Sequence, residues 1–307
     1  MKAIVHIGYP KTGTSWLQTC IFPFVAGYKM VSRNQILTRL IRPDDHEFDA
    51  EGFVNHLSEQ YGEKVIISHE DLLGNVVKWE SRGRHAQQLA MRLHQSLPGS
   101  RIVIFIRYQI DLLASLYSEY VKSGGTYYPR QYFSTATTDA RFKERSFHFE
   151  LFDFHHTIHM YEELFGRENV SVFLYEDLIQ YSERFIMYFL DRLSIELHSS
   201  VFSPRKVNAR LNRYLLNCHR WANHFTRKNI PCKRYFLNIP KWYGFTRLVT
   251  EKLNNTKLFR KKPGSCELLG EPLVAQIARY YSSSNVRLAE EGYIPPGFEG
   301  YYITLHS

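Results

Sequence analysis

Residues 6–18 read HIGYPKTGTSWLQ, and this stretch decides the fold that we expect. It follows an apolar run at residues 3–7, which is typical of a strand buried within a sheet. It leads into a helical pattern at residues 13–23. A strand, a glycine-containing turn and a helix form an anion site, because the unpaired amides of the first helical turn point toward the turn. The stretch therefore predicts a loop that holds a phosphate-like group.

The P-loop motif G-x-x-x-x-G-K-[ST] can be laid over Gly8 to Ser15, but it fails at one position. Residue 14 is threonine where the motif has its lysine, and Lys11 comes three residues earlier. A P-loop ATPase also needs a magnesium-binding acid at the end of a neighbouring strand. The best candidate strand, residues 101–106, is followed by Arg107 instead. A cation at this point suits a second phosphate better than a metal ion.

Strand patterns alternate with helical patterns along the rest of the chain. Strands are predicted at residues 3–7, 28–32, 64–68, 101–106 and 170–175, and helices at residues 13–23, 50–61, 84–96, 110–123, 149–165, 182–193, 211–226 and 272–291. This order predicts an α/β fold, a single domain over residues 1–307 with a central parallel sheet flanked by helices. Ligands of such sheets bind outside the carboxyl ends of the strands, so the loops after strands one, three and four should face one crevice.

The net charge of +9 is concentrated in residues 227–262, which we call the basic segment. It carries eleven Lys or Arg residues against Glu251 alone, with six aromatic residues interleaved, while the remaining 28 basic and 29 acidic residues nearly cancel. Because it contains Pro231 and Pro240, we expect an irregular segment. It is either a solvated surface or a patch for an acidic partner: a sulfated or uronic glycan, an anionic lipid surface, or nucleic acid.

Several other features narrow the kind of protein. The four cysteines lack C-x-x-C or ligand spacing, so we expect reduced thiols and neither a metal site nor a disulfide framework. No apolar run approaches the roughly 18 residues of a membrane span and the first strand leaves no room for a signal peptide, so we expect a cytoplasmic protein. His155, His156 and His159 have helical spacing, but no carboxylate obviously completes a metal site, which favours an amphipathic helix surface. The composition of residues 123–145 predicts a mobile loop near the crevice.

A second anion site is predicted where the fourth strand ends. Arg107 closes this strand, and Ser115 lies eight residues later in the next predicted helix. An arginine offers a planar fork to phosphate oxygens, and a hydroxyl in the following helix adds a donor to the same anion. Ser115 taken alone could instead be a small residue that lets helix and sheet touch. Together with the glycine loop, the pair predicts a nucleotide with phosphates at two ends.

These motifs resemble the sulfotransferases that use 3′-phosphoadenosine 5′-phosphosulfate (PAPS), in their free-standing bacterial form. The resemblance rests on YPKTGTSW at residues 9–16, similar to the loop that holds the donor's 5′-phosphosulfate, and on Arg107 with Ser115 at the spacing of its 3′-phosphate site. It extends to VFLYEDL at residues 172–178, similar to a later strand, and to YYSSSNVRL at residues 280–288, similar to the C-terminal helix of bacterial members. The matches span most of the chain.

The resemblance implies in-line attack of an acceptor hydroxyl or amine on the sulfur of PAPS, with adenosine 3′,5′-bisphosphate (PAP) leaving and no divalent metal required. Lys11 would stabilise the charge that develops on the oxygen bridging sulfur and phosphorus. Trp16 would stack on adenine, or else anchor its helix in the core. The donor-binding residues implied are Pro10, Lys11, Thr12, Gly13, Thr14, Ser15, Trp16, Arg107 and Ser115.

The general base is expected just after the strand at residues 64–68. In the cytosolic branch of the family the base is a histidine in a place like that of His69, whereas many bacterial relatives have Ser-x-Glu, which Ser68 and Glu70 match. His69 and Glu70 cannot both face the donor unless the strand has ended, because successive strand residues point to opposite faces. Both stay open, with Glu70 preferred on the bacterial pattern. The alternative is structural: Ser68 would cap a helix whose first turn Glu70 and Asp71 favour.

The sequence therefore predicts a PAPS-dependent sulfotransferase acting on a sugar, a glycolipid or another alcohol, with the basic segment in peripheral contact with an acidic surface. A nucleotide kinase using ATP and magnesium is the second possibility, against which the misplaced lysine and the missing strand-end acid argue. A non-enzymatic binder of polyanions or nucleic acid would use residues 227–262 but leave the loop and Arg107 unexplained. Nucleic acid is not an expected partner of the first function. The acceptor's identity and the oligomeric state do not follow from the sequence.

Overall fold

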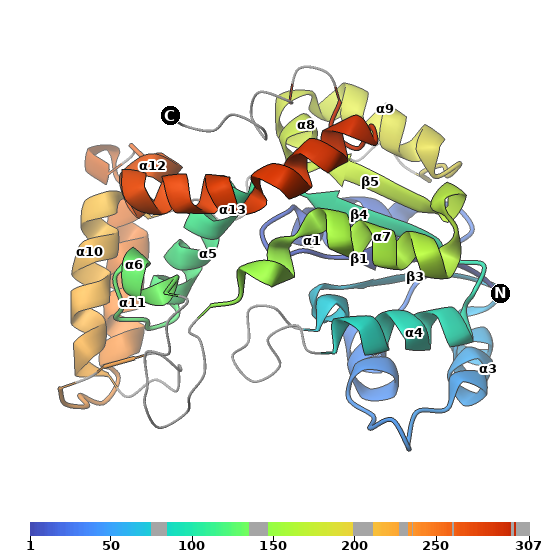
Figure 1. The fold of residues 1–307 in the computed structure, drawn as a ribbon. Helices are drawn as coiled ribbons and strands as arrows, with labels where there is room; N and C mark the ends of the chain where they lie inside the picture. Colours follow the sequence, from blue (N-terminus) through green and yellow to red (C-terminus); the bar gives the residue numbers. More distant parts are fainter. Residues whose placement is uncertain are drawn as a thin grey trace. The chain divides into compact units, whose positions relative to one another are not determined.

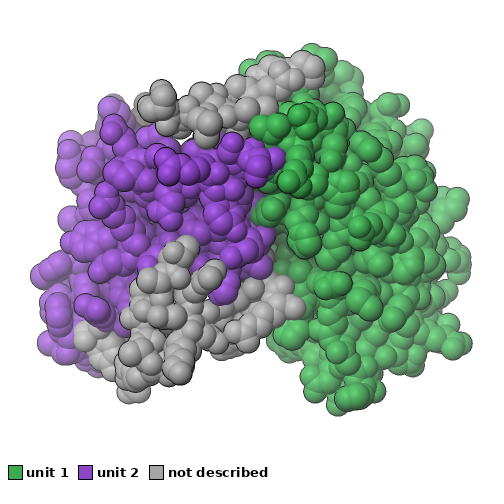
Figure 2. All heavy atoms as spheres, in the orientation of Figure 1, with its two compact units in different colours: residues 1–107, 153–207, 284–300 green, residues 108–152, 208–283, 301–307 purple. Residues whose placement is uncertain are grey.

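The computed structural model describes residues 1–74, 85–134, 147–198, 211–226, 233–234, 236–259, 261–295 and 298. The chain divides into two compact units, shown in different colours in Figure 2. The first unit comprises residues 1–107, 153–207 and 284–300, and the second comprises residues 108–152, 208–283 and 301–307. The single domain over residues 1–307 that the sequence predicts stays a prediction.

The first unit is built on a five-stranded parallel sheet with strand order β2-β3-β1-β4-β5 (Figure 1). Its strands are β1 (Lys2–Ile7), β2 (Lys29–Met30), β3 (Lys64–His69), β4 (Arg101–Ile106) and β5 (Val170–Leu174). Only the first residue of β1, β3 and β4 is exposed, which explains their continuous apolar runs, since such a sheet is covered on both faces. The predicted strands and the predicted α/β class are confirmed.

Helices of the first unit cover the two faces of this sheet. They are α1 (Thr14–Trp16), α2 (Arg33–Ile36), α3 (Ala50–Tyr61), α4 (Ala86–Ser96), α7 (Phe154–Phe165), α8 (Tyr175–Gln180) and α9 (Ser182–Arg192). Short turns of π or 3-10 helix lie at Leu17–Ile21, Phe22–Phe24, Leu37–Ile41, Glu70–Leu73 and Arg167–Asn169. α7 packs on β4 and β5, in front of the sheet in Figure 1, and α4 packs on α7. The sequence predicted α3, α4 and α9, but not α2 or α8.

The opposite face of the sheet carries an apolar cluster rich in phenylalanine. Phe105 of β4 packs on Phe173 of β5 with ring centroids 5.4 Å apart, and on Phe185 and Phe189 of α9. Leu17, Ile21 and Phe22, from the helical turns after the glycine loop, belong to the same buried cluster. The segment after the loop is thereby fixed against the strand that precedes it, because a close-packed core leaves little room for displacement.

A buried polar network lies within this face. His6 of β1 is fully buried, and its Nδ1 lies 2.8 Å from Oγ of Ser68 on the neighbouring strand β3. The amide of Gln18 donates to both the hydroxyl and the carbonyl oxygen of Ser68, at 3.1 Å each. Burial lowers the pKa of His6 to about 3, so the imidazole is neutral at physiological pH. The network joins β1, β3 and the turns that follow the loop.

The second unit is helical where it is described. It contains α5 (Gln109–Lys122), α6 (Pro129–Tyr132), α10 (Arg213–Ala222), α11 (Trp242–Asn254), α12 (Ser265–Leu269) and the first part of α13 (Glu271–Glu290), with 3-10 turns at Phe149–Phe152, Asn223–Phe225 and Lys257–Phe259. From residue 284 onward α13 belongs to the first unit. α10 and α11 lie side by side (Figure 1). The helices predicted at residues 110–123, 211–226 and 272–291 are confirmed, whereas the one predicted at 149–165 divides between the 3-10 turn and α7.

The basic segment is not irregular throughout, as the sequence led us to expect. α11 occupies 13 of its residues. Pro240 does not prevent this helix, because it precedes Lys241, the residue that caps the N-terminus, where no intrahelical hydrogen bond is required. Pro231 lies outside the described residues. The expectation was therefore wrong for residues 242–254.

Two further expectations meet the described residues only in part. Residues 123–134 include the short helix α6, while the rest of the predicted mobile loop, residues 135–145, lies outside the described residues. Three cysteines, Cys20, Cys218 and Cys266, are free thiols, as predicted, and the fourth lies outside that part of the chain. None of the helices described is both long and apolar enough to cross a membrane.

The burial of His6 predicts a specific pH dependence of stability. We expect the free energy of unfolding to fall as pH decreases from about 6.5 to about 3, because only the unfolded chain then protonates this imidazole. One proton corresponds to a slope of about 1.4 kcal/mol per pH unit. Urea titrations of the wild type and of His6→Asn, which keeps a hydrogen-bonding group near Ser68 but does not titrate, measure the difference in slope. His46→Asn, at an exposed position, is the control, and equal slopes in all three proteins would contradict the assignment.

Candidate functional site

The register of the sheet aligns the carboxyl ends of four strands. Ile7 at the end of β1 pairs with His69 of β3 on one side and with Ile104 of β4 on the other. Ile106 at the end of β4 pairs in turn with Leu174 at the end of β5. The residues that follow these strands, namely Gly8, Glu70, Arg107 and Tyr175, therefore come to one edge of the sheet. This is the edge at which parallel α/β sheets bind ligands.

The loop after β1 has a backbone that requires its glycines. Gly13 has φ 91°, in the left-handed region, and caps the N-terminus of α1. A Cβ added to it would lie 3.3 Å from Leu178 of α8. A Cβ on Gly8 would lie 2.9 Å from the hydroxyl of Thr14 and 3.4 Å from Cα of Glu70. Lys11 adopts φ 65°, which is rare for a residue with a side chain, so surrounding contacts must hold the loop in this shape.

Tyr9 supplies one of these contacts from below the loop. Its side chain is completely buried, its hydroxyl lies 2.7 Å from Oγ1 of Thr157 on α7, and its ring meets Phe154 edge-on at 4.9 Å. Burial raises the pKa of this phenol above its ordinary value, so Tyr9 stays neutral. The hydroxyls of Thr12 and Thr14 donate to the Tyr9 carbonyl at 2.6 and 3.4 Å. These two hydroxyls stabilise the loop itself, whereas Ser15 is exposed and can reach a ligand directly.

Arg107 clamps the loop from the end of β4. Its Nη1 donates to the carbonyl oxygen of Lys11 at 2.8 Å, and its guanidinium lies 4.5 Å from the centre of the Tyr175 ring. Its Nε is buried and has no hydrogen-bond partner among the described residues. A guanidinium has five N–H donors, and a buried donor left without an acceptor is costly. Arg107 can therefore hold the loop and still donate to an anion.

The two candidate bases lie in different environments. β3 ends at His69 and a 3-10 turn begins at Glu70, so the alternation of the strand no longer applies to Glu70. His69 is buried, and its Nδ1 accepts a hydrogen bond from the amide of Asp71 at 3.0 Å. Because an amide N–H can only donate, the neutral ring carries its proton on Nε2. Glu70 is exposed, and its carboxylate accepts a hydrogen bond from Arg33 of α2 at 3.1 Å.

The structural alternative for Ser68 is wrong. The cap of the turn at Glu70–Leu73 is the side chain of His69, and Ser68 instead bonds His6 and Gln18. The reason is the pleat: Ser68 points to the face of the sheet that carries His6, away from the turn that follows.

The remaining predicted residues fall into two groups. Pro10 is buried beneath the loop, and Trp16 is half-buried and packs against the apolar cluster, as an anchor of its helix would. Stacking of Trp16 on adenine stays a prediction. Ser115 lies partly buried in α5 and belongs to the second unit, so its distance from Arg107 also stays a prediction.

Three residues of this edge were not among the predicted site residues. Tyr175 follows β5 just as Arg107 follows β4, and the rule that ligands meet strand ends could have revealed it. Gln18 lies within the quoted stretch, but nothing in the sequence shows that it reaches Ser68. Arg33 has no sequence signal, since its contact with Glu70 spans 37 residues.

The histidines of α7 meet a carboxylate that the sequence did not reveal. His155 and His159 both approach the side chain of Glu291, 132 to 136 residues further along the chain. His156, between them, is exposed. The expected helix surface therefore describes His156, whereas His155 and His159 make a partly exposed contact with the segment after α13.

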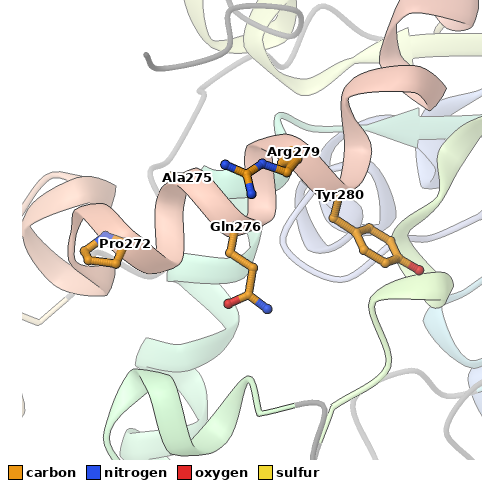
Figure 3. Close-up of a pocket in the computed structure, with 5 residues that line it drawn as sticks. All are labelled: Pro272, Ala275, Gln276, Arg279 and Tyr280. Atoms are coloured by element: carbon orange, nitrogen blue, oxygen red, sulfur yellow. The ribbon is translucent and has the colours of Figure 1, made fainter.

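A pocket along α13 lies apart from these residues in the chain. Figure 3 shows the five side chains that line it, Pro272, Ala275, Gln276, Arg279 and Tyr280. All five come from one helix in the second unit, and none is a predicted site residue. This pocket therefore gives no evidence about the loop after β1.

The fold itself has relatives among solved structures. The crystal structure of a sulfotransferase from Alicyclobacillus acidocaldarius matches with a TM-score of 0.50 and 17% identity, over 67% of this chain and 85% of that chain. The chain has a sulfotransferase fold. A mouse sulfotransferase, SULT7A1, complexed with PAP, matches with a TM-score of 0.34 and 20% identity over 84% of this chain and 87% of that chain, a likeness on which no argument rests. No family model matches the sequence, and no curated protein matches it either.

Proposed function

We propose that the protein is a sulfotransferase that moves a sulfuryl group from PAPS to a hydroxyl of an acceptor. The observation that carries this proposal is the pairing of the glycine loop with Arg107. The guanidinium bonds the carbonyl of Lys11 and keeps a buried donor available at the strand end where a P-loop ATPase could place a magnesium-binding acid. Two positive side chains at one sheet edge suit a doubly phosphorylated nucleotide.

The residues at this edge fit the donor in three respects. Gly8 and Gly13 allow the compact shape of the loop, because a Cβ on either would press on neighbouring protein atoms. Lys11 is the cationic residue of this loop, and Arg107 offers a buried Nε donor. In the proposed complex the loop holds the 5′-phosphosulfate and Arg107 holds the 3′-phosphate, to which the resemblance adds the hydroxyl of Ser115. PAPS supplies the activated sulfuryl group, and PAP is the product.

Lys11 would act in the transition state more than in the ground state. An acceptor oxygen forms a bond to sulfur while the bond from sulfur to the bridging oxygen breaks, and the electron pair stays on that oxygen as PAP departs. Lys11 would stabilise this developing charge, a preorganised electrostatic contact of the kind that typically contributes about 10²- to 10³-fold in rate. The rare backbone conformation of Lys11 is consistent with such a role, since strain concentrates at functional sites.

Glu70 fits the role of general base better than His69. The acceptor's proton must reach an unprotonated atom, and Nδ1 of His69 already accepts the amide of Asp71 while its Nε2 carries the proton. Glu70 is exposed beside Gly8, and its partner Arg33 is exposed as well. Exposed ion pairs contribute only about 0–1 kcal/mol, so an acceptor hydroxyl can displace Arg33 or bind beside it.

For the acceptor we propose a sugar, a glycolipid or another alcohol. The support is the polar pair Glu70 and Arg33, since a hydroxyl acceptor needs a group that accepts its proton and neighbours that bond its other oxygens. The proposal further includes that the protein is cytoplasmic and of bacterial type, and that the reaction requires no divalent metal. These points rest on the sequence and on the resemblance.

A nucleotide kinase is the second candidate, and one observation favours it. Glu70 follows β3, which neighbours β1, and a carboxylate at that place could hold magnesium. Against it, Arg33 already bonds that carboxylate, and the loop has Thr14 where a P-loop has its lysine.

The nucleotide preference separates the two functions. We expect PAP to raise the melting temperature, by an amount equivalent to about 2.7 kcal/mol when its concentration is about 100 times the Kd, and ATP with magnesium to have no comparable effect. Arg107→Ala should weaken PAP binding about tenfold or more, because a hydrogen bond to a charged group contributes about 1.5–3 kcal/mol. Thermal melts across a PAP titration measure both effects.

The matched control for the charge at the loop is Lys2→Ala, which removes an exposed lysine at the other end of β1. With a working acceptor, Lys11→Ala should lower kcat about 100-fold or more while the ligand-free melting temperature changes little, and Lys2→Ala should keep wild-type turnover. If ATP with magnesium stabilised the protein and PAP did not, the result would instead favour the nucleotide kinase function.

The base is tested by comparing Glu70→Gln with His69→Ala. We expect Glu70→Gln to lower kcat about 10²- to 10⁴-fold, because the amide cannot take up a proton, with only a small change in stability at this exposed position. His69→Ala should mainly lower the melting temperature, since it removes the cap of the turn at Glu70–Leu73. If Glu70→Gln turned over as fast as the wild type, Glu70 would not be the general base. If His69→Ala lost turnover while its melting temperature stayed that of the wild type, His69 would be the base.

A further inference from the structure

α11 is an inverted helix. The side chains that it turns toward the protein are polar: Thr246, Thr250 and Asn254, spaced four residues apart, are all buried. Most of its apolar side chains point outward instead, with Phe245 58% and Leu248 60% exposed, although Trp242 and Tyr243 of its first turn are half-buried. A surface helix of a globular protein ordinarily shows the opposite arrangement, an apolar stripe toward the core and polar residues toward water.

The inversion is stable because the buried polar groups have partners. The hydroxyl of Thr250 donates to the carbonyl of Thr246 and lies 3.3 Å from His219 of α10. The side-chain oxygen of Asn254 accepts the amide of Asn212 at 2.9 Å and the ammonium of Lys262 at 2.7 Å. A polar stripe satisfied in this way fixes which face of α11 is inside, so the apolar face has to be outside.

Exposed apolar side chains are also frequent in the segments on either side of the helix. Eight of the 17 exposed large apolar side chains of the described residues lie between residues 236 and 258, and together we call them the apolar face: Phe236, Leu237, Ile239, Phe245, Leu248, Val249, Leu253 and Leu258. Leu258 alone is 82% exposed. Single exposed apolar residues are ordinary, but a concentration of this kind marks an interaction surface.

Exposed cations alternate along the chain with the residues of the apolar face. Arg234, Lys241, Arg247, Lys252, Lys257 and Lys261 are all exposed, and the one acid of the basic segment, Glu251, is paired with Arg247 at 2.9 Å. The ammonium of Lys252, which shares the outward side of α11, can extend along the neighbouring aliphatic groups toward a charged layer. Apolar side chains flanked by cations match the two layers of an anionic membrane, acyl chains below phosphate headgroups.

We propose that the apolar face and these exposed cations bind the surface of an anionic lipid membrane, with α11 lying in the plane of the headgroups. A 13-residue helix is too short to span the roughly 30 Å of hydrocarbon, so it lies on the membrane. A second copy of the chain is disfavoured, because two such faces would bring like charges together. Nucleic acid and sulfated glycans would use the cations but would leave Leu248, Leu253 and Leu258 in water. The proposal holds whether or not the chain transfers sulfate.

Vesicle binding by the full chain tests this surface. We expect the wild type to co-sediment with phosphatidylcholine vesicles that contain phosphatidylglycerol and not with vesicles of phosphatidylcholine alone. Phe245→Ser with Leu248→Ser should weaken this binding about 100-fold, because each large apolar side chain removed from water contributes about tenfold in a partition constant. Lys252→Glu with Lys257→Glu should weaken it most at low salt, where charges are least screened.

The matched control is Met187→Ser with Tyr188→Ser, an equally exposed apolar pair on α9 of the first unit, which should bind vesicles like the wild type. Because all these positions are exposed, we expect the melting temperatures to stay close to that of the wild type. Equal binding by the Phe245 and Leu248 variant would overturn the proposal. The proposal would also be overturned if the wild type self-associated without vesicles and this variant did not. It would be overturned as well if the wild type bound heparin or RNA but did not bind anionic vesicles.

A separate observation concerns His155, His159 and Glu291 in the first unit. Nε2 of His155 lies 2.9 Å from Oε1 of Glu291, and Nε2 of His159 lies 3.0 Å from Oε2 and 3.3 Å from Oε1. The three ligand atoms lie within 4.8 Å of one another. Ligand atoms that share a tetrahedral zinc ion at about 2.0–2.2 Å lie roughly 3.3–3.6 Å apart, so the side chains need to separate by only a few tenths of an ångström to admit the ion.

The surrounding residues hold this cluster in place. Nδ1 of His159 lies 3.5 Å from the largely buried carboxylate of Glu162, a partner that favours a proton on Nδ1 and leaves Nε2 as the ligand atom. Tyr293 donates to Glu162, and Arg167 donates to the carbonyl oxygen of Glu291 at 3.0 Å. The helix and the segment after α13 are thus joined on both sides of the three ligands.

We infer that His155, His159 and Glu291 form a site for a divalent transition metal such as Zn²⁺, which would fasten the segment after α13 to α7. Two imidazoles and one carboxylate leave a coordination position for water, and this ligand set suits Zn²⁺ better than Ca²⁺ or Mg²⁺, which prefer oxygen alone. The site involves none of the residues proposed for sulfate transfer.

Metal titration of a chelator-treated, tag-free protein tests the cluster. We expect one Zn²⁺ to bind and raise the melting temperature, and Co²⁺ to give a visible absorption band. His159→Ala and Glu291→Gln should each lose this binding, and Glu162→Gln should weaken it about 10- to 100-fold. His156→Ala, the neighbouring exposed histidine, should bind like the wild type. Equal Zn²⁺ affinity in His159→Ala and His156→Ala, or no Zn²⁺ effect on the wild type, would show that the contacts are hydrogen bonds alone.

Discussion

The parallel register of β3, β1, β4 and β5 is the constraint on which the candidate site depends. Ile7 stands between His69 and Ile104, so the chain leaves three neighbouring strands at one edge of the sheet. A shift of one residue in any strand would turn its buried face toward the other side and separate these ends. The phenylalanine cluster and the network of His6, Ser68 and Gln18 make such a shift costly. The cluster includes residues of β1, β3, β4 and β5, and the network fixes β1 against β3.

Within this frame the loop after β1 is held in a conformation that its sequence alone would not favour. The left-handed backbone of Lys11 costs of the order of 1 kcal/mol or more. Contacts from three directions offset the cost: Tyr9 bonded to α7, the hydroxyl of Thr12 on the Tyr9 carbonyl, and Arg107 on the Lys11 carbonyl. A ligand that enters such a loop does not have to order it, so more of its interaction energy remains for binding or for catalysis.

The sequence was sufficient for features that are encoded locally. Each central strand is a continuous apolar run bounded by polar residues, so the sheet could be predicted. The positions of the glycine loop and of Arg107 at strand ends could be predicted as well, because they follow these runs directly in the sequence. The contacts that were missed join residues far apart in the chain, such as Arg33 with Glu70 and His155 with Glu291. No local pattern shows that the partner exists, because the pairing is created only when the sheet brings the segments together.

The orientation of α11 could not be predicted from the sequence either. Its polar stripe of Thr246, Thr250 and Asn254 looks like a solvent face when the sequence is read alone, and tertiary partners on α10 and beyond reverse it. This orientation also changes the interpretation of the charge distribution. Outside the basic segment acids and bases nearly cancel, so Lys11 and Arg107 do not belong to a region of excess charge. The excess positive charge belongs to a segment that also exposes aliphatic side chains. Charge alone would suit any polyanion, but charge combined with an apolar helix face is complementary to a layer that is anionic outside and hydrocarbon inside.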